Sequence, residues 1–388
     1  MSWKKVKLGN TATFTNGYAF KPQDWDSEGK EIIRIQNLTG KGKDINYFNG
    51  DIDEKYKVTK GDLLISWSAT LGIFEWQKED AWLNQHIFKV VFNKMAIDKA
   101  FFKHLISSIL MSFSQRVHGS TMKHITKGNF DNTDVSIPSL PEQKRIATIL
   151  DKAEALCQKN KEQLAVYDEL LQSVFLDIFG DPVSNPMGWE KKVLINLISN
   201  IDGGWSPKCD GFSRKSKENW AILTLSSISE RTYKETFNKN LPESLSPKTN
   251  LEVKSNDLLF SRKNTKELVG ACAYVFNTQP KLMIPDTIFR INYIPLKING
   301  VYTYFLLNHI NFRKSIQKLA TGSAGSMPNI SKEKLKKLYI PLPPITLQNK
   351  FAQIVENIEA QKELLKKSIN ESDDLFNGLV QKAFKGEL

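Results

Sequence analysis

The histidines and cysteines are the side chains of this chain that could hold a metal ion. The five histidines are His86, His104, His118, His124 and His309, and the three cysteines are Cys157, Cys209 and Cys272. A structural zinc site needs such ligands in closely spaced pairs, as in CxxC. No such pairing occurs, and the two histidines around Gly119-Ser120 are typical of polar loop residues. The sequence therefore predicts neither a metal site nor a disulfide framework.

Motifs for cofactor binding or catalysis are also missing. The sequence has no glycine-rich dinucleotide fingerprint, no GxxxxGK[ST] phosphate loop and no HExxH. The run Gly40-Lys41-Gly42-Lys43 lacks the spacing of a phosphate loop and is predicted to be a basic loop. No cluster of Asp, Glu and Lys resembles a nuclease centre. We therefore expect no catalytic site and no cofactor in this chain.

The charge balance favours a negatively charged partner. The 388 residues include 54 Lys and Arg against 42 Asp and Glu, a formal net charge of +12. Such an excess indicates a polyanion, most simply DNA or RNA, although a generally basic cytoplasmic protein is the alternative. No run approaches the roughly 18 apolar residues of a membrane span. The start MSWKKVKLGN lacks the apolar segment of a signal peptide, and three cysteines suit a reducing cytoplasm.

Any binding surface must be positioned by a long helix predicted within residues 137–182. Pro141 suits a first helical turn, and Gly180 followed by Asp181-Pro182 suits its end. The predicted helix, Pro141 to Phe179, would span ~58 Å. Alternating steps of four and three give the seam of a coiled coil. This seam comprises Ile146, Leu150, Ala153, Cys157, Asn160, Leu164, Tyr167, Leu171, Val174 and Ile178.

The same pattern recurs at residues 340–388. From Gln143 and Gln348 onward the two stretches align without a gap, and each ends in a Phe followed closely by Gly. The second seam comprises Phe351, Val355, Ile358, Lys362, Leu365, Ile369, Ser372, Phe376, Leu379 and Ala383. Polar Asn160 could fix the register of the pair, or lie at the edge of the seam facing water. Matching lead-ins, phase and endings predict a duplicated unit rather than two unrelated amphipathic helices.

The segments before the two helices, residues 1–136 and 183–339, also repeat each other. Short strand-like runs such as 31–35, 63–67 and 86–92 are separated by turns, and a helix is predicted over 98–113. GDLLIS at 61–66 returns as NDLLFS at 256–261, and ITK at 125–127 returns as ISK at 330–332. The predicted fold is α+β, a tandem duplication of a β-rich domain and a long helix.

These features resemble the specificity subunit of type I DNA restriction–modification systems. The features that carry the resemblance are the lead-ins IPSLP and IPLPP, the Gln that opens each helix, the C-terminal AFKGEL and the GDLL run. The resemblance covers nearly the whole chain. The first lead-in is two residues shorter than the second, and Ile345-Thr346-Leu347 replaces expected acidic residues. Both departures put a close twofold pseudo-symmetry in doubt.

The resemblance implies a division of labour among subunits. Each β-rich domain would be a target recognition domain that reads one half of a bipartite site in double-stranded DNA. The two helices would pair antiparallel, set the spacer between the half-sites and recruit two methyltransferase subunits. Those subunits would bind S-adenosylmethionine, and restriction subunits would use ATP and magnesium. None of these activities would reside in this chain, which would have no membrane partner.

Candidate DNA-contacting residues lie in the turns that differ between the two copies. Arg and Lys suit guanine, Asn and Gln suit adenine, and Lys, Arg and hydroxyls suit phosphate. The candidates of the first domain are Tyr18, Lys21, Arg34, Gln36, Asn37, Ser66, Trp67, Ser68, Thr70, Ser120, Thr121 and Lys123. Those of the second are Trp205, Lys208, Ser226, Ser227, Arg262, Lys263, Asn264, Ser323, Ser326 and Asn329.

Some alternatives stay open at the level of sequence. Arg34 and Gln36 would share one face of a strand, which could face DNA or simply solvent. The run Arg262-Lys263-Asn264 is the strongest candidate, and its alteration should affect one half-site only. A fused methyltransferase or nuclease is a second reading that would need motifs not found here. A coiled-coil adaptor without a role in DNA binding is a third.

Overall fold

The computed structural model describes residues 3–40, 42, 44–116, 126–322 and 327–388. The chain divides into two compact units, each of which combines a β-rich part with portions of two long helices. Unit 1 contains residues 1–162 and 367–388, and unit 2 contains residues 163–366.

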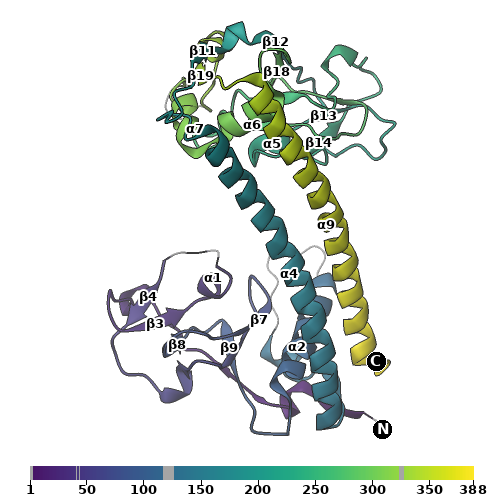
Figure 1. Ribbon diagram of the computed structural model, residues 1–388. Coiled ribbons are helices and arrows are strands. Elements are labelled where there is room, and N and C mark those ends of the chain that lie inside the picture. The colour runs from purple at the N-terminus through teal and green to yellow at the C-terminus, as the bar shows by residue number, and fades with distance from the viewer. Residues whose placement is uncertain (1–2, 41, 43, 117–125, 323–326) are drawn as a thin grey trace. The chain divides into compact units, whose positions relative to one another are not determined.

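The two long helices are α4 (Leu140–Phe179) and α9 (Ile345–Lys385), as Figure 1 shows. The start and end of α4 therefore agree with the predicted helix to within one residue. All twenty predicted seam residues are buried or half-buried, including the polar Asn160, Lys362 and Ser372. In unit 2, the buried Lys362 pairs with Asp168 at 2.7 Å and with Glu359 at 2.6 Å, so its charge is compensated.

Within each unit the two helices run in opposite directions. In unit 1, Lys161 pairs with Asp373 at 2.9 Å, whereas Arg145 near the start of α4 donates to the carbonyl of the terminal Leu388. In unit 2, residue numbers along α4 rise from Asp168 to Phe175 while those of their partners on α9 fall from Lys362 to Phe351. The antiparallel pairing implied by the resemblance is thus present in both units.

The described residues of unit 1 form two four-stranded sheets and one strand pair. Their orders are β2-β9-β6-β7, β4-β3-β8-β5 and β1-β10. The strands are β1 (Lys4–Lys7), β2 (Thr13–Asn16), β3 (Lys30–Ile33), β4 (Asn46–Phe48), β5 (Lys57–Val58), β6 (Leu63–Ser66), β7 (Gly72–Glu75), β8 (Ala81–Leu83), β9 (Ile87–Val91) and β10 (Asp134–Ile137). The helices besides α4 and α9 are α1 (Ile35–Leu38), α2 (Lys99–Arg116) and α3 (Lys127–Asp131).

Unit 2 repeats this topology. Its sheet β12-β18-β15-β16 corresponds to β2-β9-β6-β7, its sheet β14-β13-β17 to β4-β3-β8, and its pair β11-β19 to β1-β10. The strands are β11 (Lys191–Val193), β12 (Ile198–Gly203), β13 (Ala221–Leu223), β14 (Asn238–Asn240), β15 (Leu258–Ser261), β16 (Cys272–Tyr274), β17 (Leu282–Met283), β18 (Ile288–Tyr293) and β19 (Tyr339–Pro341). The helices are α5 (Ser226–Ser229), α6 (Gly300–Asn308), α7 (Ile310–Gln317) and α8 (Lys332–Lys336).

The predicted segment boundaries cut through structural elements. The first lead-in contributes Ile137 to β10, and the second contributes Ile340 and Pro341 to β19. Both isoleucines are buried because their side chains complete the core of their unit. The predicted strand 31–35 is also wrong at its end, since β3 stops at Ile33 and α1 begins at Ile35. The difference in lead-in length leaves the two strand pairs equivalent.

The glutamine that opens each long helix bonds the helix to its own unit. Gln143 and Gln348 are almost completely buried. The amide oxygen of Gln348 accepts from the backbone N–H of Asn299 at 2.9 Å, and its Nε2 donates to the carbonyl of Pro343 at 2.7 Å. Gln143 makes the same two bonds with Asp98 and Pro138. This residue therefore satisfies two backbone groups that would otherwise be buried without a partner.

In the repeated Asp-Leu-Leu run, the Asp closes a turn and the two leucines begin the strand that follows, β6 or β15. In unit 1, Asp62 accepts from the N–H of Thr59 and pairs with Lys89 at 2.9 Å. In unit 2, Asp257 accepts from the N–H of Lys254 and pairs with Arg290 at 3.2 Å. The preceding residue has a positive φ in both copies, which Gly61 and Asn256 tolerate. The motif therefore reflects folding of the repeat and not a reactive site.

Helix α4 ends in a turn organised by Asp181. Gly180 has a φ of +73°, which ends the helix. The carboxylate of Asp181 accepts from the backbone N–H of Val183 at 2.8 Å and of Ser184 at 3.0 Å, and Asn311 on α7 donates to it at 2.7 Å. Partial burial opposes ionisation, but these hydrogen bonds prevail and lower the pKa of Asp181 to about 2.

This shift predicts an acid-sensitive contribution to the stability of unit 2. The folded-state pKa lies below the ordinary value near 3.9, so the stabilisation is complete above about pH 5 and is lost progressively as the pH falls to about 1. We expect Asp181→Asn and Asn311→Ala to unfold with a shallower pH dependence than the wild type in this window. Denaturant titrations of the full chain at several pH values would measure it. Equal slopes for all three proteins would contradict this assignment.

Candidate nucleic-acid interface

The turn after β15 in unit 2 holds its backbone rigidly. The N–H of Arg262 donates to the carbonyl of Thr287 at 3.0 Å, and the carbonyl of Arg262 accepts from the N–H of Ile330 at 2.8 Å. Two further backbone bonds at 2.9 Å join Thr321 and Asn329. The turn is therefore fixed on both sides by segments distant in sequence, a suitable support for a side chain that must be placed accurately.

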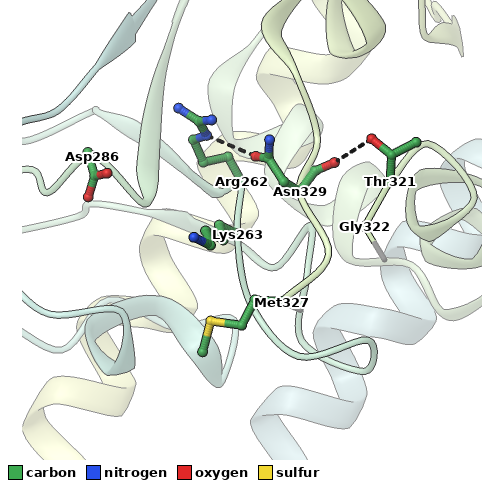
Figure 2. Close-up of a pocket in the computed structure, with 7 residues that line it drawn as sticks. All are labelled: Arg262, Lys263, Asp286, Thr321, Gly322, Met327 and Asn329. Atoms are coloured by element: carbon green, nitrogen blue, oxygen red, sulfur yellow. Dashed lines mark hydrogen bonds between the residues drawn. The ribbon is translucent and has the colours of Figure 1, made fainter. Parts of the chain in front are cut away.

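The Arg262 side chain is fixed as well. Its Nε donates to Oδ1 of Asn329 at 3.0 Å, as Figure 2 shows. Its guanidinium lies over the ring of the buried Phe289, 5.0 Å from the centroid. Stacking on an aromatic face and a bond at Nε leave the two Nη atoms as a planar fork. Such a fork suits an acceptor pair on a base edge or a phosphate.

A cavity of about 340 Å³ adjoins this arginine. It is lined by Arg262, Lys263, Asp286, Thr321, Gly322, Met327 and Asn329 (Figure 2). Lys263 is exposed. Asp286 is held by Ser206, whose hydroxyl donates to the carboxylate at 2.5 Å. The cavity is thus a polar recess with two cations and one carboxylate. These side chains can bind hydrogen-bond acceptors and donors of a ligand, but they do not make a catalytic centre.

Unit 1 has the same arrangement with a different side chain. Trp67 follows β6 as Arg262 follows β15, and it stacks on Phe88 with ring centroids 5.6 Å apart. Phe88 and Phe289 occupy equivalent positions on β9 and β18. The two units therefore share an aromatic platform and differ in the residue that it supports.

Two lysines on these platforms were missed by the sequence analysis. Lys127 lies 5.9 Å from the centre of the Phe88 ring, and Lys332 lies 5.7 Å from that of Phe289. Each begins a short helix whose N-cap hydroxyl, from Thr126 or Ser331, accepts a backbone N–H. The repeat of ITK as ISK was the available signal. A lysine that occurs at the start of the same helix in both copies has a defined place in the fold, in addition to its charge.

Several predicted contacts of unit 2 have side chains that are buried or bonded to the protein itself. Asn264 is buried: its amide donates to Ser229 and Ser261, and its Oδ1 accepts from the N–H of Thr265. Ser227 is completely buried on α5. Neither side chain can reach a ligand from its present position. Asn329 uses Oδ1 to accept from Nε of Arg262.

Several candidates of unit 1 also bond to the protein itself, and one prediction about their strand is wrong. Ser66 is completely buried and donates to the carbonyl of Thr70 at 2.6 Å, which closes the turn. Arg34 and Gln36 do not share a strand face, because Arg34 is the N-cap of α1. Arg34 donates to Asn46, and Gln36 and Asn37 donate to the carbonyl of Asp44. Their side chains stabilise the local fold of the turn.

The other candidates remain predictions. Tyr18, Lys21, Lys208 and Ser226 are exposed, whereas Ser68, Thr70 and Trp205 are half-buried. Tyr18 belongs to an aromatic group with Phe20 and Tyr56, and Lys248 lies over the ring of Trp205 at 4.6 Å. Five further candidates, Ser120, Thr121, Lys123, Ser323 and Ser326, lie outside the described residues.

One histidine has ligand-like neighbours that the sequence did not predict. His104 on α2 lies 2.7 Å from Asp151 on α4, and Glu154 brings a second carboxylate within 4.8 Å of this group. Asp151 and Glu154 lie one helical turn apart on α4, whereas His104 lies on a different helix. No spacing in the sequence therefore indicated that the three side chains would meet. The His104–Asp151 contact joins α2 to α4, and Lys103 lies 3.8 Å from Glu154. We regard the cluster as an ionic contact between helices.

Comparison with known proteins gives this architecture a family. The profile described as "Type I restriction modification DNA specificity domain" matches residues 1–166 and again 188–372. The chain belongs to this type I restriction–modification specificity family. A relative, the specificity subunit of the type I restriction enzyme EcoBI from Escherichia coli, is 24% identical over 425 residues, which cover 100% of this chain and 86% of the relative. The chain is accordingly a specificity subunit with two specificity domains, a non-catalytic part of such a system.

Solved structures of the family share the fold. The S subunit of a type I restriction–modification system from M. genitalium matches with a TM-score of 0.55 at 12% identity, covering 99% of this chain and 96% of that one. A chain from structural work on assembly and conformational transition of the type I system matches with a TM-score of 0.57 at 15% identity, covering 100% of this chain and 98% of that one.

In the described part of this chain, no helix is long and apolar enough to cross a membrane.

Proposed function

We propose that this specificity subunit reads a bipartite site in double-stranded DNA, one half through each β-rich part. Helices α4 and α9 set the length of the unread spacer between the half-sites. Each helix has about forty residues, so it spans ~60 Å. Half-sites read from one face of the duplex lie roughly 34 Å apart, or a multiple of this. The helices are thus long enough to hold two reading surfaces at such a separation.

The observation that carries this proposal is that both units have the same aromatic platform, Phe88 or Phe289, but place different side chains on it. Both units keep the Phe on the equivalent strands β9 and β18, the second strand in each sheet order, and the Lys beside it. They differ at the residue stacked on that ring, which is Trp67 in one and Arg262 in the other. A duplicated scaffold that places different side chains on the same aromatic ring suits recognition of two different sequences by one architecture.

The partners follow from the same role. We propose that two methyltransferase subunits bind the helical region and carry S-adenosylmethionine. Restriction subunits join them and use ATP and magnesium, whereas this chain holds no cofactor. The net charge of +12 suits the DNA partner, and the cytoplasm is the compartment in which these components meet.

Genome-wide adenine methylation tests the proposal in the native host. We expect deletion of the gene to remove methylation from one bipartite motif and re-expression of the full chain to restore it. The purified complex should bind the same motif, with log K falling linearly as log salt rises, because phosphate contacts release counterions.

The alternatives predict other outcomes. An adaptor that only joins subunits would leave the complex without salt-dependent affinity for the motif. A fused enzyme would methylate or cleave DNA as the isolated chain. An unchanged methylation pattern after deletion, together with no preference for any duplex sequence, would reject the reading function.

A further inference from the structure

We infer that Arg262 recognises guanine in the half-site bound by unit 2, and that Asn329 is the residue that positions it. This inference rests on the proposed function and adds a base identity to it.

The donor pattern of Arg262 matches a guanine edge. Its Nε is occupied by Asn329, while among the described residues no hydrogen-bond acceptor or carboxylate partner engages its Nη atoms. Guanine presents O6 and N7 as adjacent acceptors in the major groove, and Arg binds them in a bidentate manner. A guanidinium already held by a ring and a side-chain oxygen loses little conformational entropy when it makes these two bonds.

The setting favours a base over a phosphate. Asp286 lines the same cavity as Arg262 and Lys263. A carboxylate on the wall of the cavity repels a phosphate, since like charges brought together are unfavourable. The same carboxylate is compatible with a base pair, because the amino group of cytosine is a donor that Asp can accept. The cavity therefore offers a G·C pair both donors and an acceptor, whereas a phosphate could use only the donors.

Asn329 acts through Arg262. Its Oδ1 is the acceptor for Nε, and its backbone N–H and carbonyl both bond to Thr321. The side chain is thus presented by a fixed backbone and fixes the guanidinium in turn. Removal of this oxygen frees Arg262 to rotate on the Phe289 ring, which lowers selectivity without removing the charge.

Unit 1 provides an internal comparison. Trp67 has the equivalent place on the Phe88 ring. Its side chain offers a single N–H donor, so it cannot contact O6 and N7 of guanine together as Arg can. The guanine requirement assigned to Arg262 should therefore appear in one half-site only.

The test maps methylation by the full complex in cells that lack other adenine methylation. Arg262→Lys keeps the charge but loses the fork, so we expect discrimination for guanine at one position to fall about 5- to 150-fold. Asn329→Ala should relax the same position, and Asn329→Asp, which restores an acceptor for Nε, should retain the guanine requirement. The matched control Lys263→Ala removes a charge from the same turn. It should weaken binding evenly across sequences without changing the motif.

The outcomes separate this inference from the proposed function. A wild-type motif without a guanine in one half-site, or one that all three Arg262 and Asn329 variants leave unchanged, would overturn the inference alone. The inference would also be overturned if a variant bound all DNA sequences equally more weakly and kept the same motif. A phosphate contact or a folding defect would produce that result. Thermal unfolding of each variant identifies the latter. If no motif depends on the wild-type chain, the proposed function itself fails.

Discussion

Replacing Gln348 by alanine is expected to lower the free energy of unfolding of unit 2 by about 2–5 kcal/mol. Gln348 is completely buried and makes hydrogen bonds to the N–H of Asn299 and the carbonyl of Pro343. Alanine leaves both backbone groups buried without a partner, and each such group costs about 1–3 kcal/mol. Denaturant unfolding followed by hydrogen exchange would show whether the loss lies in unit 2, since a chain with two units need not unfold in one step.

Gln353 provides the matched control because it lies on the same helix and is exposed. Gln353→Ala should change stability by no more than about 0.5 kcal/mol. Gln143→Ala should reproduce the large effect in unit 1, where the same two bonds are made to Asp98 and Pro138. If Gln348→Ala and Gln353→Ala unfold alike, the glutamine does not bond the helix to its unit as the structure indicates.

The long helices and the duplication could be predicted from the sequence because both depend on periodicity. A seam repeated over ten positions, with Pro near its start and Gly at its end, is a strong local signal. The match between 61–66 and 256–261 likewise identified equivalent strands, β6 and β15. The function followed from the same features, since family resemblance was carried by the lead-ins and helices and not by the reading turns.

The direction of side chains in turns could not be predicted. Ser66 and Asn264 have the polar side chains expected at a DNA surface, yet both point inward and bond to the turn that contains them. Asp286 gave no signal because the chain returns to the cavity from a distant segment. Residue type restricts what a side chain can bind, whereas the tertiary fold decides what it faces. The glutamines show the same limit, since the backbone N–H groups from which they accept lie 45 and 49 residues earlier in the sequence.

The seam also underestimated the apolar face of α4. It includes Leu171, Val174 and Ile178 but omits Phe175, which is only 1% exposed. The reason is that this part of α4 packs against α6 as well as α9, so a stripe wider than a coiled-coil seam is buried. A helix that joins a globular core needs this wider face, and strict a/d spacing does not predict it.

Phe175→Ala is therefore expected to destabilise unit 2 by about 3–5 kcal/mol. The ring lies 5.6 Å from that of Phe351 on α9, 6.0 Å from those of Tyr302 and Phe305 on α6, and 5.2 Å from that of Phe179. Its removal leaves a cavity bordered by α4, α9 and α6. These rigid helices cannot all move to fill it. Denaturant unfolding of the full chain would measure the loss.

The neighbouring Leu176 distinguishes packing from helix propensity. It lies on the same turn and is 39% exposed, so Leu176→Ala removes a side chain of similar type without opening a cavity. We expect a change of less than about 1 kcal/mol for this variant. If the two substitutions cost the same, α4 is stabilised by its own helix formation and not by the core of unit 2. If Phe175→Ala alone is destabilising, this core holds the C-terminal portion of α4 in unit 2, as the proposed spacer role requires.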